Sequence, residues 1–203
     1  MALYWFPLYA YLRRKGQPAE QAEDLVQGFF ARVLDKDALV GIDRSKGKFR
    51  SFLLASLNNF LANEQDKTGA AKRGGGQRVF SFDSMDAETR YAAEPMDQMT
   101  PERVFDRRWA LAVLDQVLKR LREDYTARSQ GELFAALEHL LVGSDGAKYG
   151  NIAQRLGMTE NAVKVAVHRL RRCYRGLLRE EIFQTVAEPE LVDEEIRQLL
   201  QSL

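Results

Sequence analysis

Amide, imidazole, guanidinium and ammonium groups recur on one face of a helix that the sequence predicts after Thr159. At about 100° per residue, this face carries Asn161, Lys164, Val165, His168, Arg172 and Arg175, with Arg169 and Arg171 on its flanks. Arg and His can donate hydrogen bonds to guanine edges, Asn can pair with adenine, and Val can contact a thymine methyl group. Outlying Arg side chains can hold phosphates. The face, with Thr159 at its start, is therefore predicted to bind the major groove of duplex DNA; a solvated basic helix in a bundle is the alternative.

The segment that must position this face runs from Tyr149 to Arg175 and predicts two short helices around a tight turn. Gly157 follows Ala153 by four residues, where a helix can end in a left-handed turn that Gly adopts readily. Thr159 can cap the second helix, and Val163 falls six residues after Gly157. This spacing is typical of a helix-turn-helix, in which the small residue allows close crossing and the Val closes the core. The predicted core face of the second helix consists of Val163, Ala166, Val167, Leu170, Tyr174 and Leu177.

A second polar stripe lies on the helix predicted from Phe49 to about Asp66. Its apolar face is made by Phe49, Leu53, Leu57, Phe60 and Leu61. A different face carries Phe52, Ser56, Asn59 and Asn63. An aromatic ring can stack on an unpaired base while amides read its edge, so this stripe suits single-stranded DNA. The alternative is that Phe52 packs against the first helix and the Asn side chains are solvated; helical geometry alone does not decide between them.

The stretch from Lys67 to Arg78 is basic and Gly-rich. It lacks the Gly-Lys-Ser/Thr ending and the preceding strand of a nucleotide-binding phosphate loop. We expect either a flexible arm that contacts phosphates, beginning at Lys67, or a plain linker.

Composition places the chain among ordinary globular proteins. Its 203 residues suffice for one large or two small domains, and its formal net charge is +1. Charge is segregated along the chain, however, with a basic stretch at 164–179 and acidic stretches at 83–106 and 180–195. The single cysteine, Cys173, excludes an internal disulfide and is expected to fill space in the core. No leader or membrane span is recognised, so we expect a cytoplasmic protein without membrane contact.

Residue patterns that would indicate catalysis are lacking. The chain has two histidines, His139 and His168, and neither lies near a Cys or carboxylate cluster at ligand spacing. No Ser-His-Asp set, nucleotide loop or zinc pattern is found. We expect no enzymatic activity, no metal and no cofactor.

Helical periodicity extends over most of the chain, and the predicted fold class is all-α. The aromatic-rich segment 3–12 is expected to pack on the following helices, and residues from Ala22 to Leu34 follow the i, i+3, i+4, i+7 rule. Thr100 and Pro101 predict a helix start, and 132–142 and 191–203 are amphipathic. The expected organisation is two small helical domains, 1–78 and 101–182, joined by a flexible acidic linker at 79–100 and followed by a tail helix at 183–203.

These modules together resemble bacterial RNA polymerase sigma factors of the extracytoplasmic-function (ECF) type over nearly the whole chain. The resemblance is carried by DLVQGFFARVL at 24–34, FRSFLLASLNNFLANE at 49–64 and the C-terminal helix-turn-helix. It implies that the first motif binds the β′ clamp helices of core RNA polymerase. The residues expected to make that contact are Asp24, Leu25, Gln27, Phe30 and Arg32.

The same resemblance assigns the two predicted DNA surfaces. Phe49, Arg50, Phe52 and Asn59 match the family pattern on a helix that opens the −10 promoter element and holds an unstacked base. The helix-turn-helix matches the region that reads the −35 element. A β-flap contact, a possible anti-sigma factor and a monomeric free state are further implications. One departure is that Val163, Lys164, Val165 and Ala166 stand where the family usually has Val-Lys-Ser-Arg, so the −35 preference is not transferred.

Two other expectations follow from the pattern. The family has more helix before the aromatic segment, so Tyr4, Trp5 and Phe6 are expected to be partly uncovered. The competing function is a stand-alone helix-turn-helix regulator, which would bind palindromic DNA as a dimer without polymerase. A third class, an interaction module that sequesters another protein through its tail, would not bind DNA.

Overall fold

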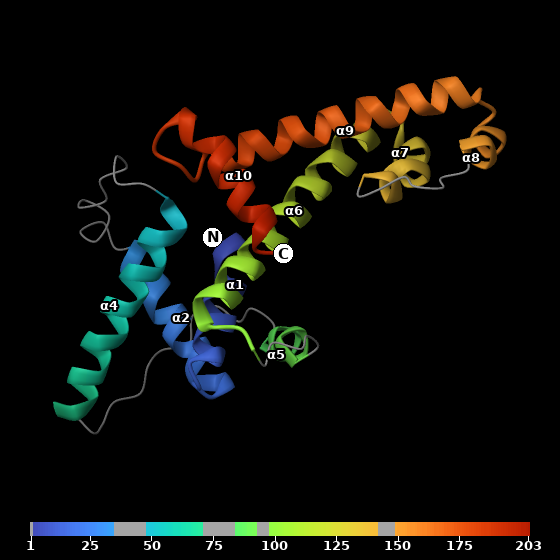
Figure 1. Cartoon of the computed structure of the whole chain (residues 1–203). Helices are drawn as coiled ribbons and strands as arrows, with labels where there is room; N and C mark the ends of the chain where they lie inside the picture. The colour runs from blue at the N-terminus through green and yellow to red at the C-terminus, as the bar shows by residue number, and fades with distance from the viewer. Residues whose placement is uncertain (1, 35–47, 71–83, 93–97, 142–148) are drawn as a thin grey trace. The chain divides into compact units, whose positions relative to one another are not determined.

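The computed structural model describes residues 2–34, 48–70, 84–92, 98–141 and 149–203 (Figure 1). Over these residues the fold is all-α, as predicted, with one isolated antiparallel bridge between Lys48 and Val186. Within the same ranges, none of the helices combines the length and apolar content that crossing a bilayer requires. The chain divides into two compact units, residues 1–112 with 185–203, and residues 113–184.

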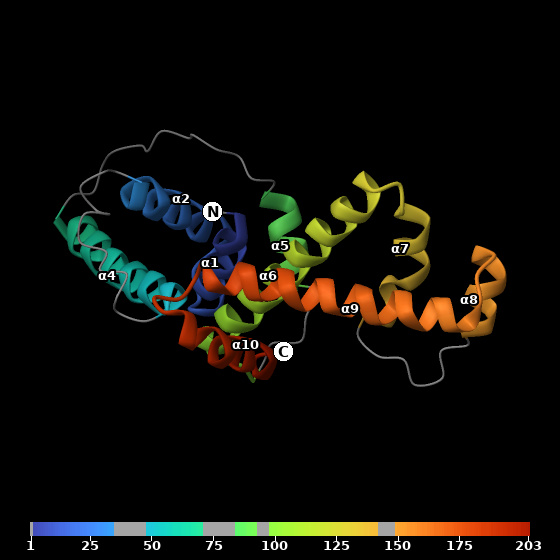
Figure 2. The ribbon, with the colours of Figure 1, turned by 90° about the horizontal axis from the view of Figure 1, so that it is seen from above.

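The first unit is built around three long helices. These are α1 (Ala2–Arg14), α2 (Ala19–Leu34) and α4 (Phe49–Ala70), and α2 lies beside both of the others (Figure 2). Helix α1 is followed by a turn at Gly16, whose φ of +89° permits the Gln17 amide to donate to the Leu12 carbonyl at 3.1 Å. The apolar face of α2 buries Ala22, Val26 and Phe29, in agreement with its predicted periodicity.

The aromatic residues of α1 are covered, which corrects the expectation that its start is exposed. Tyr4, Trp5 and Phe6 are each 8% exposed, and Tyr9 is buried further along the helix. The Trp5 and Tyr9 rings stack with centroids 5.5 Å apart. The guanidinium of Arg90 lies 4.3 Å from the Phe6 ring centroid. Cation–π contact and burial against neighbouring helices together cover this aromatic start.

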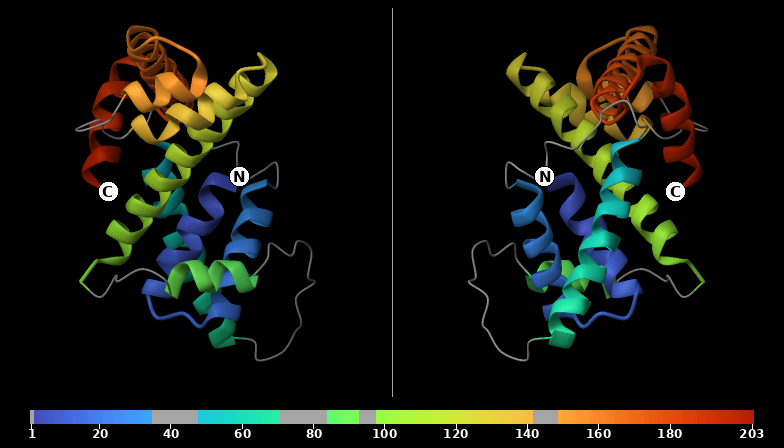
Figure 3. Two further views of the ribbon diagram at one scale, coloured as in Figure 1. Left: turned by 90° about the vertical axis from the view of Figure 1, so that its right-hand side faces the viewer. Right: turned by 90° about the vertical axis from the view of Figure 1, so that its left-hand side faces the viewer.

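Helix α5 (Ser84–Ala92) lies inside the segment that was expected to be a flexible linker. It lies against α1 (Figure 3), where Glu88 makes polar contacts, and its Ala87 is buried. Arg13 donates to both carboxylate oxygens of Glu88, at 2.9 and 2.7 Å, and the Tyr9 hydroxyl donates at 2.5 Å. The expectation of an unstructured linker is therefore wrong for 84–92, because these polar contacts compensate for a short helix with little apolar surface.

The second unit surrounds one apolar core. Helix α6 (Pro101–Ala127) begins in the first unit and continues into the second, which adds α7 (Gly131–Leu137), the 3-10 turn Glu138–Leu140, α8 (Tyr149–Leu156) and α9 (Glu160–Phe183). The buried core residues are Leu121, Tyr125, Phe134, Leu137, Leu140, Ala153, Val163, Val167 and Leu170. They come from all four helices and the turn, so α8 and α9 pack against the same core.

The boundaries of the two units differ from those expected. The predicted boundary near residue 100 falls at the start of α6, whereas the units divide within that helix, between Ala112 and Val113. The segment 185–203, expected to be a separate tail, belongs to the first unit and contains α10 (Val192–Gln201) after the 3-10 turn Pro189–Leu191. Long-range contacts of the last helix with the start of α4, described below, account for this.

Candidate nucleic-acid interface

The turn between α8 and α9 has the geometry that its sequence predicts. Gly157 has a φ of +62°, and the Met158 amide donates to the Ala153 carbonyl at 2.9 Å. The Gly157 amide donates to the Gln154 carbonyl at 3.4 Å, which completes a Schellman motif at the end of α8. The Thr159 hydroxyl then accepts from the Ala162 amide at 3.2 Å and caps α9. Ala153 and Val163 are both buried, as expected for a helix-turn-helix.

The polar face predicted on α9 is exposed. Its exposed members are Asn161, Lys164, Val165, His168, Arg169, Arg172 and Arg175. Val165 is 53% exposed and lies among these polar side chains. The opposite face buries Val163, Val167 and Leu170 in the core of the second unit. Helix α9 therefore presents one apolar side chain within a row of hydrogen-bond donors.

Arg171 differs from its neighbours on α9. Its guanidinium donates to the Leu140 carbonyl through Nε at 3.1 Å and Nη2 at 2.7 Å. Leu140 ends the 3-10 turn that follows α7, so this contact fixes the turn against α9. Arg171 was predicted to contact DNA, but in this conformation it serves the fold of the unit. Cys173 packs at the edge of the core, in agreement with the predicted filling role.

The stripe predicted on α4 is accessible along its length. Phe52 is 36% exposed, Asn59 and Asn63 are exposed, and Ser56 is half-buried. Phe52 lies beside Phe49, with ring centroids 6.3 Å apart, and Phe49 meets Tyr4 edge-on at 5.2 Å. These contacts orient the Phe52 ring and leave part of it open. The side chain of Lys67 and residues 71–78 of the predicted basic arm lie outside the described residues.

Arg50 was predicted to contact DNA, yet it is 9% exposed and surrounded by partners within the first unit. It donates to Glu195 through Nε at 2.5 Å, to Gln198 through Nη2 at 2.9 Å, and to Asp106 through Nη1. Its guanidinium also lies 5.0 Å from the Trp109 ring centroid. Burial opposes the charge of Arg50, but the hydrogen bonds and charges of the two carboxylates raise its pKa. Arg50 is thus not presented to a ligand in this conformation.

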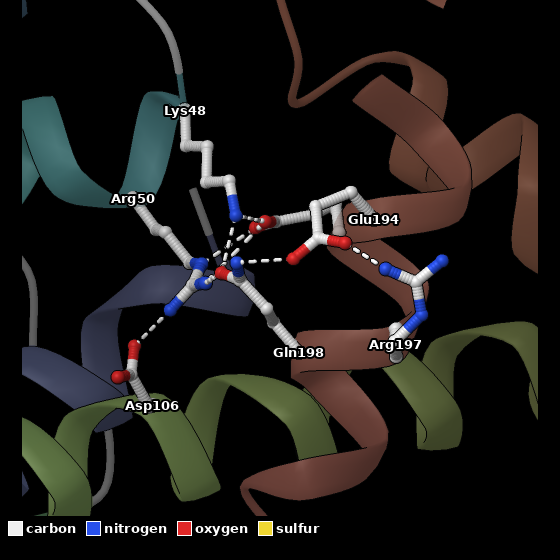
Figure 4. Close-up of polar contacts among 7 residues, drawn as sticks. Lys48, Arg50, Asp106, Glu194, Arg197 and Gln198 are labelled. Carbon is white, nitrogen blue, oxygen red and sulfur yellow. Dashed lines mark hydrogen bonds and ion pairs between the residues drawn. The ribbon is translucent and has the colours of Figure 1, made fainter. Parts of the chain in front are cut away.

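Lys48 joins the same cluster, which Figure 4 shows at the junction of α4, α6 and α10. Its ammonium lies 2.7 Å from Glu195 Oε2 and also donates to Gln198. The side chain of Gln198 in turn donates to Glu194 at 2.8 Å. Glu195 is fully buried, at 0% exposure, so both its oxygens depend on these donors.

The residues predicted to bind core polymerase are accessible on α2, outside its buried face of Ala22, Val26 and Phe29. Asp24 and Arg32 are exposed, while Leu25, Gln27 and Phe30 are half-buried. The Gln27 amide donates to Glu23 at 3.1 Å. Phe30 lies beside the buried Phe29, with centroids 5.8 Å apart. Together these residues offer charge, amide and apolar surface, a composition suited to contact with a protein partner.

Sequence reasoning did not identify Lys48, Glu195 or Gln198 as members of a common cluster. The described residues hold no group of three or more His, Cys, Asp or Glu side chains that could bind a metal ion. Comparisons with protein-family models, with curated proteins and with solved structures find no match for this chain.

Proposed function

We propose that this protein is a sigma factor of the extracytoplasmic-function type, which binds core RNA polymerase and directs it to promoter DNA. The observation that carries the proposal is the exposed face of α9, where donors for guanine and adenine edges flank an exposed Val165. This face stands on a helix-turn-helix whose turn, cap and core are well formed.

The stripe on α4 supports a second contact, with unpaired DNA. Phe52 offers an open ring, and Asn59 and Asn63 offer exposed amides about two and three turns further on. Stacking on one aromatic residue contributes about 1–3 kcal/mol per base and tolerates any base. Side-chain amides that reach base edges would add a preference for particular bases. A sigma factor requires such a surface, since it must hold the non-template strand when the promoter opens.

The accessible residues of α2 outside its buried face are the proposed polymerase contact. A protein with two weak DNA surfaces becomes specific when a partner holds both, because the second contact is then intramolecular. Core polymerase would supply that partner through its β′ clamp helices, bound by Asp24, Leu25, Gln27, Phe30 and Arg32. The cytoplasm is the compartment in which this function operates.

Co-purification with core RNA polymerase tests the proposal. The wild-type chain should bind stoichiometrically, and Asp24→Ala/Gln27→Ala should weaken binding about tenfold, which corresponds to about 1.4 kcal/mol. The matched control is Asp124→Ala/Gln130→Ala, which removes the same two side-chain types from exposed positions in the second unit. This control should bind as the wild type does.

Two outcomes would overturn the proposal. One is a folded wild-type chain that does not bind polymerase, and the other is equal weakening by both double substitutions. A stable dimer that binds palindromic duplex DNA without polymerase would instead identify a stand-alone regulator.

A further inference from the structure

The C-terminal segment, residues 185–203, occupies the beginning of α4. The Thr185 carbonyl accepts from the Phe49 amide at 2.9 Å, and Val186 pairs with Lys48 in the isolated bridge. Helix α10 then buries Val192, Glu195 and Leu199. The segment is thus attached at both its start and its last helix.

Lys48 extends the line of the α4 stripe. The positions 48, 52, 56, 59 and 63 are spaced by four, four, three and four residues, so they share a helical face. The Phe52 amide donates to the Lys48 carbonyl at 3.2 Å, which shows that helical geometry begins at Lys48. Lys48 is therefore the first position of the α4 stripe, one turn before Phe52. A strand whose base stacks on Phe52 would find in Lys48 the cation of this stripe that can contact its phosphate backbone.

The carboxylate of Glu195 contacts the two cations as a phosphate would. One oxygen accepts from Arg50 Nε at 2.5 Å, and the other lies 2.7 Å from Lys48 Nζ. With α10 in place, Lys48 and Arg50 contribute two positive charges and Glu195 and Asp106 two negative charges, so the cluster sums to zero. Without Glu195 the same cluster would carry one net positive charge. Helix α10 thus neutralises the end of the stripe where a polyanion would bind.

We infer that α10 is an internal competitor of the nucleic-acid backbone for Lys48 and Arg50. In the free chain, Glu195 occupies both cations; a single strand that binds the α4 stripe displaces it and places a phosphate there. This inference rests on the part of the proposed function that assigns α4 to single-stranded DNA. Helix α10 has 10 residues, and isolated helices shorter than about 12–15 residues are marginal in water, so its displacement is coupled to its unfolding.

Binding of a fluorescently labelled oligodeoxythymidine by the full chain tests the inference. Glu195→Gln keeps the shape of the side chain but releases the cations, and we expect it to tighten binding about fivefold. The bound strand places the same phosphate on these cations in both chains, so the dependence of log K on log salt should change by less than about 0.7, the contribution of one phosphate on single strands. The control is Glu190→Gln, which makes the same charge change at an exposed position of the 3-10 turn before α10.

The control should change affinity less than twofold. Adding Arg50→Gln to Glu195→Gln should reduce the gain, because one of the released cations is then missing. A Glu195→Gln chain that binds no more tightly than Glu190→Gln would overturn the inference.

Hydrogen exchange on the wild-type chain provides a second test that needs no substitution in the cluster. Saturating oligodeoxythymidine should accelerate exchange of the backbone amides of α10, and unchanged exchange would overturn the inference even if Glu195→Gln fails to fold. Neither test contains polymerase. If the oligonucleotide displaces α10 but the chain does not bind polymerase, the proposed function alone is contradicted. If the chain binds polymerase but the oligonucleotide does not displace α10, this inference alone is contradicted.

Discussion

Arg50 and Glu195 are separated by 145 positions in the sequence, yet Arg50 Nε lies 2.5 Å from Glu195 Oε1 in the interior of the first unit. Glu195 is fully buried and Arg50 nearly so. Removal of one partner from a buried pair leaves the other without compensation for its lost hydration. The pair therefore links the last helix of the chain to the start of α4.

Glu195→Ala should destabilise the first unit. Arg50 keeps Asp106 and Gln198 as partners, so we expect a loss of about 2–3 kcal/mol, somewhat below the range for a fully orphaned buried charge. Urea unfolding followed by circular dichroism measures it. The control is Glu190→Ala, at an exposed position of the 3-10 turn before α10, which should cost less than about 1 kcal/mol. Similar losses for the two variants would contradict the importance of the buried pair.

The sequence predicted local features well and distant contacts poorly. Ala153, Gly157 and Val163 lie within eleven positions of one another, and their spacing alone defines the turn that the structure contains. Nothing in the pattern around Glu195 distinguishes it from the solvated carboxylates beside it. Glu195 becomes buried only when α10 packs against Arg50, which lies 145 positions away in the sequence. The local pattern around Arg50 therefore predicted contact with DNA and gave no sign of this internal partner.

Helix α5 was missed for a related reason. The segment SMDAETRYA has few apolar residues, and its helix is held by Glu88, which bonds to Tyr9 and Arg13 from α1. A helix stabilised by polar contacts with a distant element has a weak hydrophobic period. By contrast, the start and the two faces of α9 were predicted correctly, because the faces differ strongly in polarity within a single segment. The helix is longer than the short one expected, with 24 residues that end at Phe183.

Two left-handed residues permit a test of the helix endings. Ser129 has a φ of +57° and occupies the same position after α6 that Gly157 occupies after α8. A non-Gly residue in this conformation is strained, so Ser129→Gly should stabilise the second unit by about 0.5–1 kcal/mol. Gly157→Ala should destabilise it by about 1 kcal/mol for the same reason. Thermal unfolding measures both, and shifts of the same sign in the two variants would contradict this account.

The contact of Glu88 with α1 should make stability depend on pH. Hydrogen bonds from Arg13, aided by Tyr9, hold the pKa of Glu88 below its ordinary value. A carboxyl with a lowered folded pKa stabilises the fold above its unfolded pKa of about 4.3, and the contribution disappears as the pH falls through the folded pKa. The wild type should therefore unfold at a higher temperature than Glu88→Gln at neutral pH, and the difference should shrink towards acid pH. The control Glu123→Gln, at an exposed position on α6, should show no such convergence.

Two basic residues of α9 should respond differently to substitution. Lys164 is exposed on the predicted DNA face, so Lys164→Ala should lower the salt slope of duplex binding by about one unit. Arg171 holds the Leu140 carbonyl, so Arg171→Ala should lower stability and leave the slope nearly unchanged. Binding to promoter duplex at several salt concentrations, together with thermal unfolding, separates the two effects. An unchanged slope for Lys164→Ala would place its ammonium away from DNA.

Phe52 should act when the promoter opens. Its ring is partly exposed and oriented by Phe49, and an unpaired base can stack on it only after the duplex has separated. Phe52→Ala should therefore reduce open-complex formation by about tenfold, within the range of about 1–3 kcal/mol for one stacked base, and leave closed-complex binding nearly intact. Permanganate reactivity of unpaired thymines measures opening, and filter binding at low temperature measures the closed complex.

The matched control for Phe52 is Phe183→Ala, since Phe183 is 53% exposed on α9 and lies outside the α4 stripe. Loss of exposed aromatic surface as such would affect both variants alike, whereas loss of a stacking platform affects Phe52→Ala alone. Equal reduction of opening and of closed-complex binding by Phe52→Ala would contradict stacking, because a side chain that contacts only unpaired bases cannot stabilise a complex in which all bases are paired.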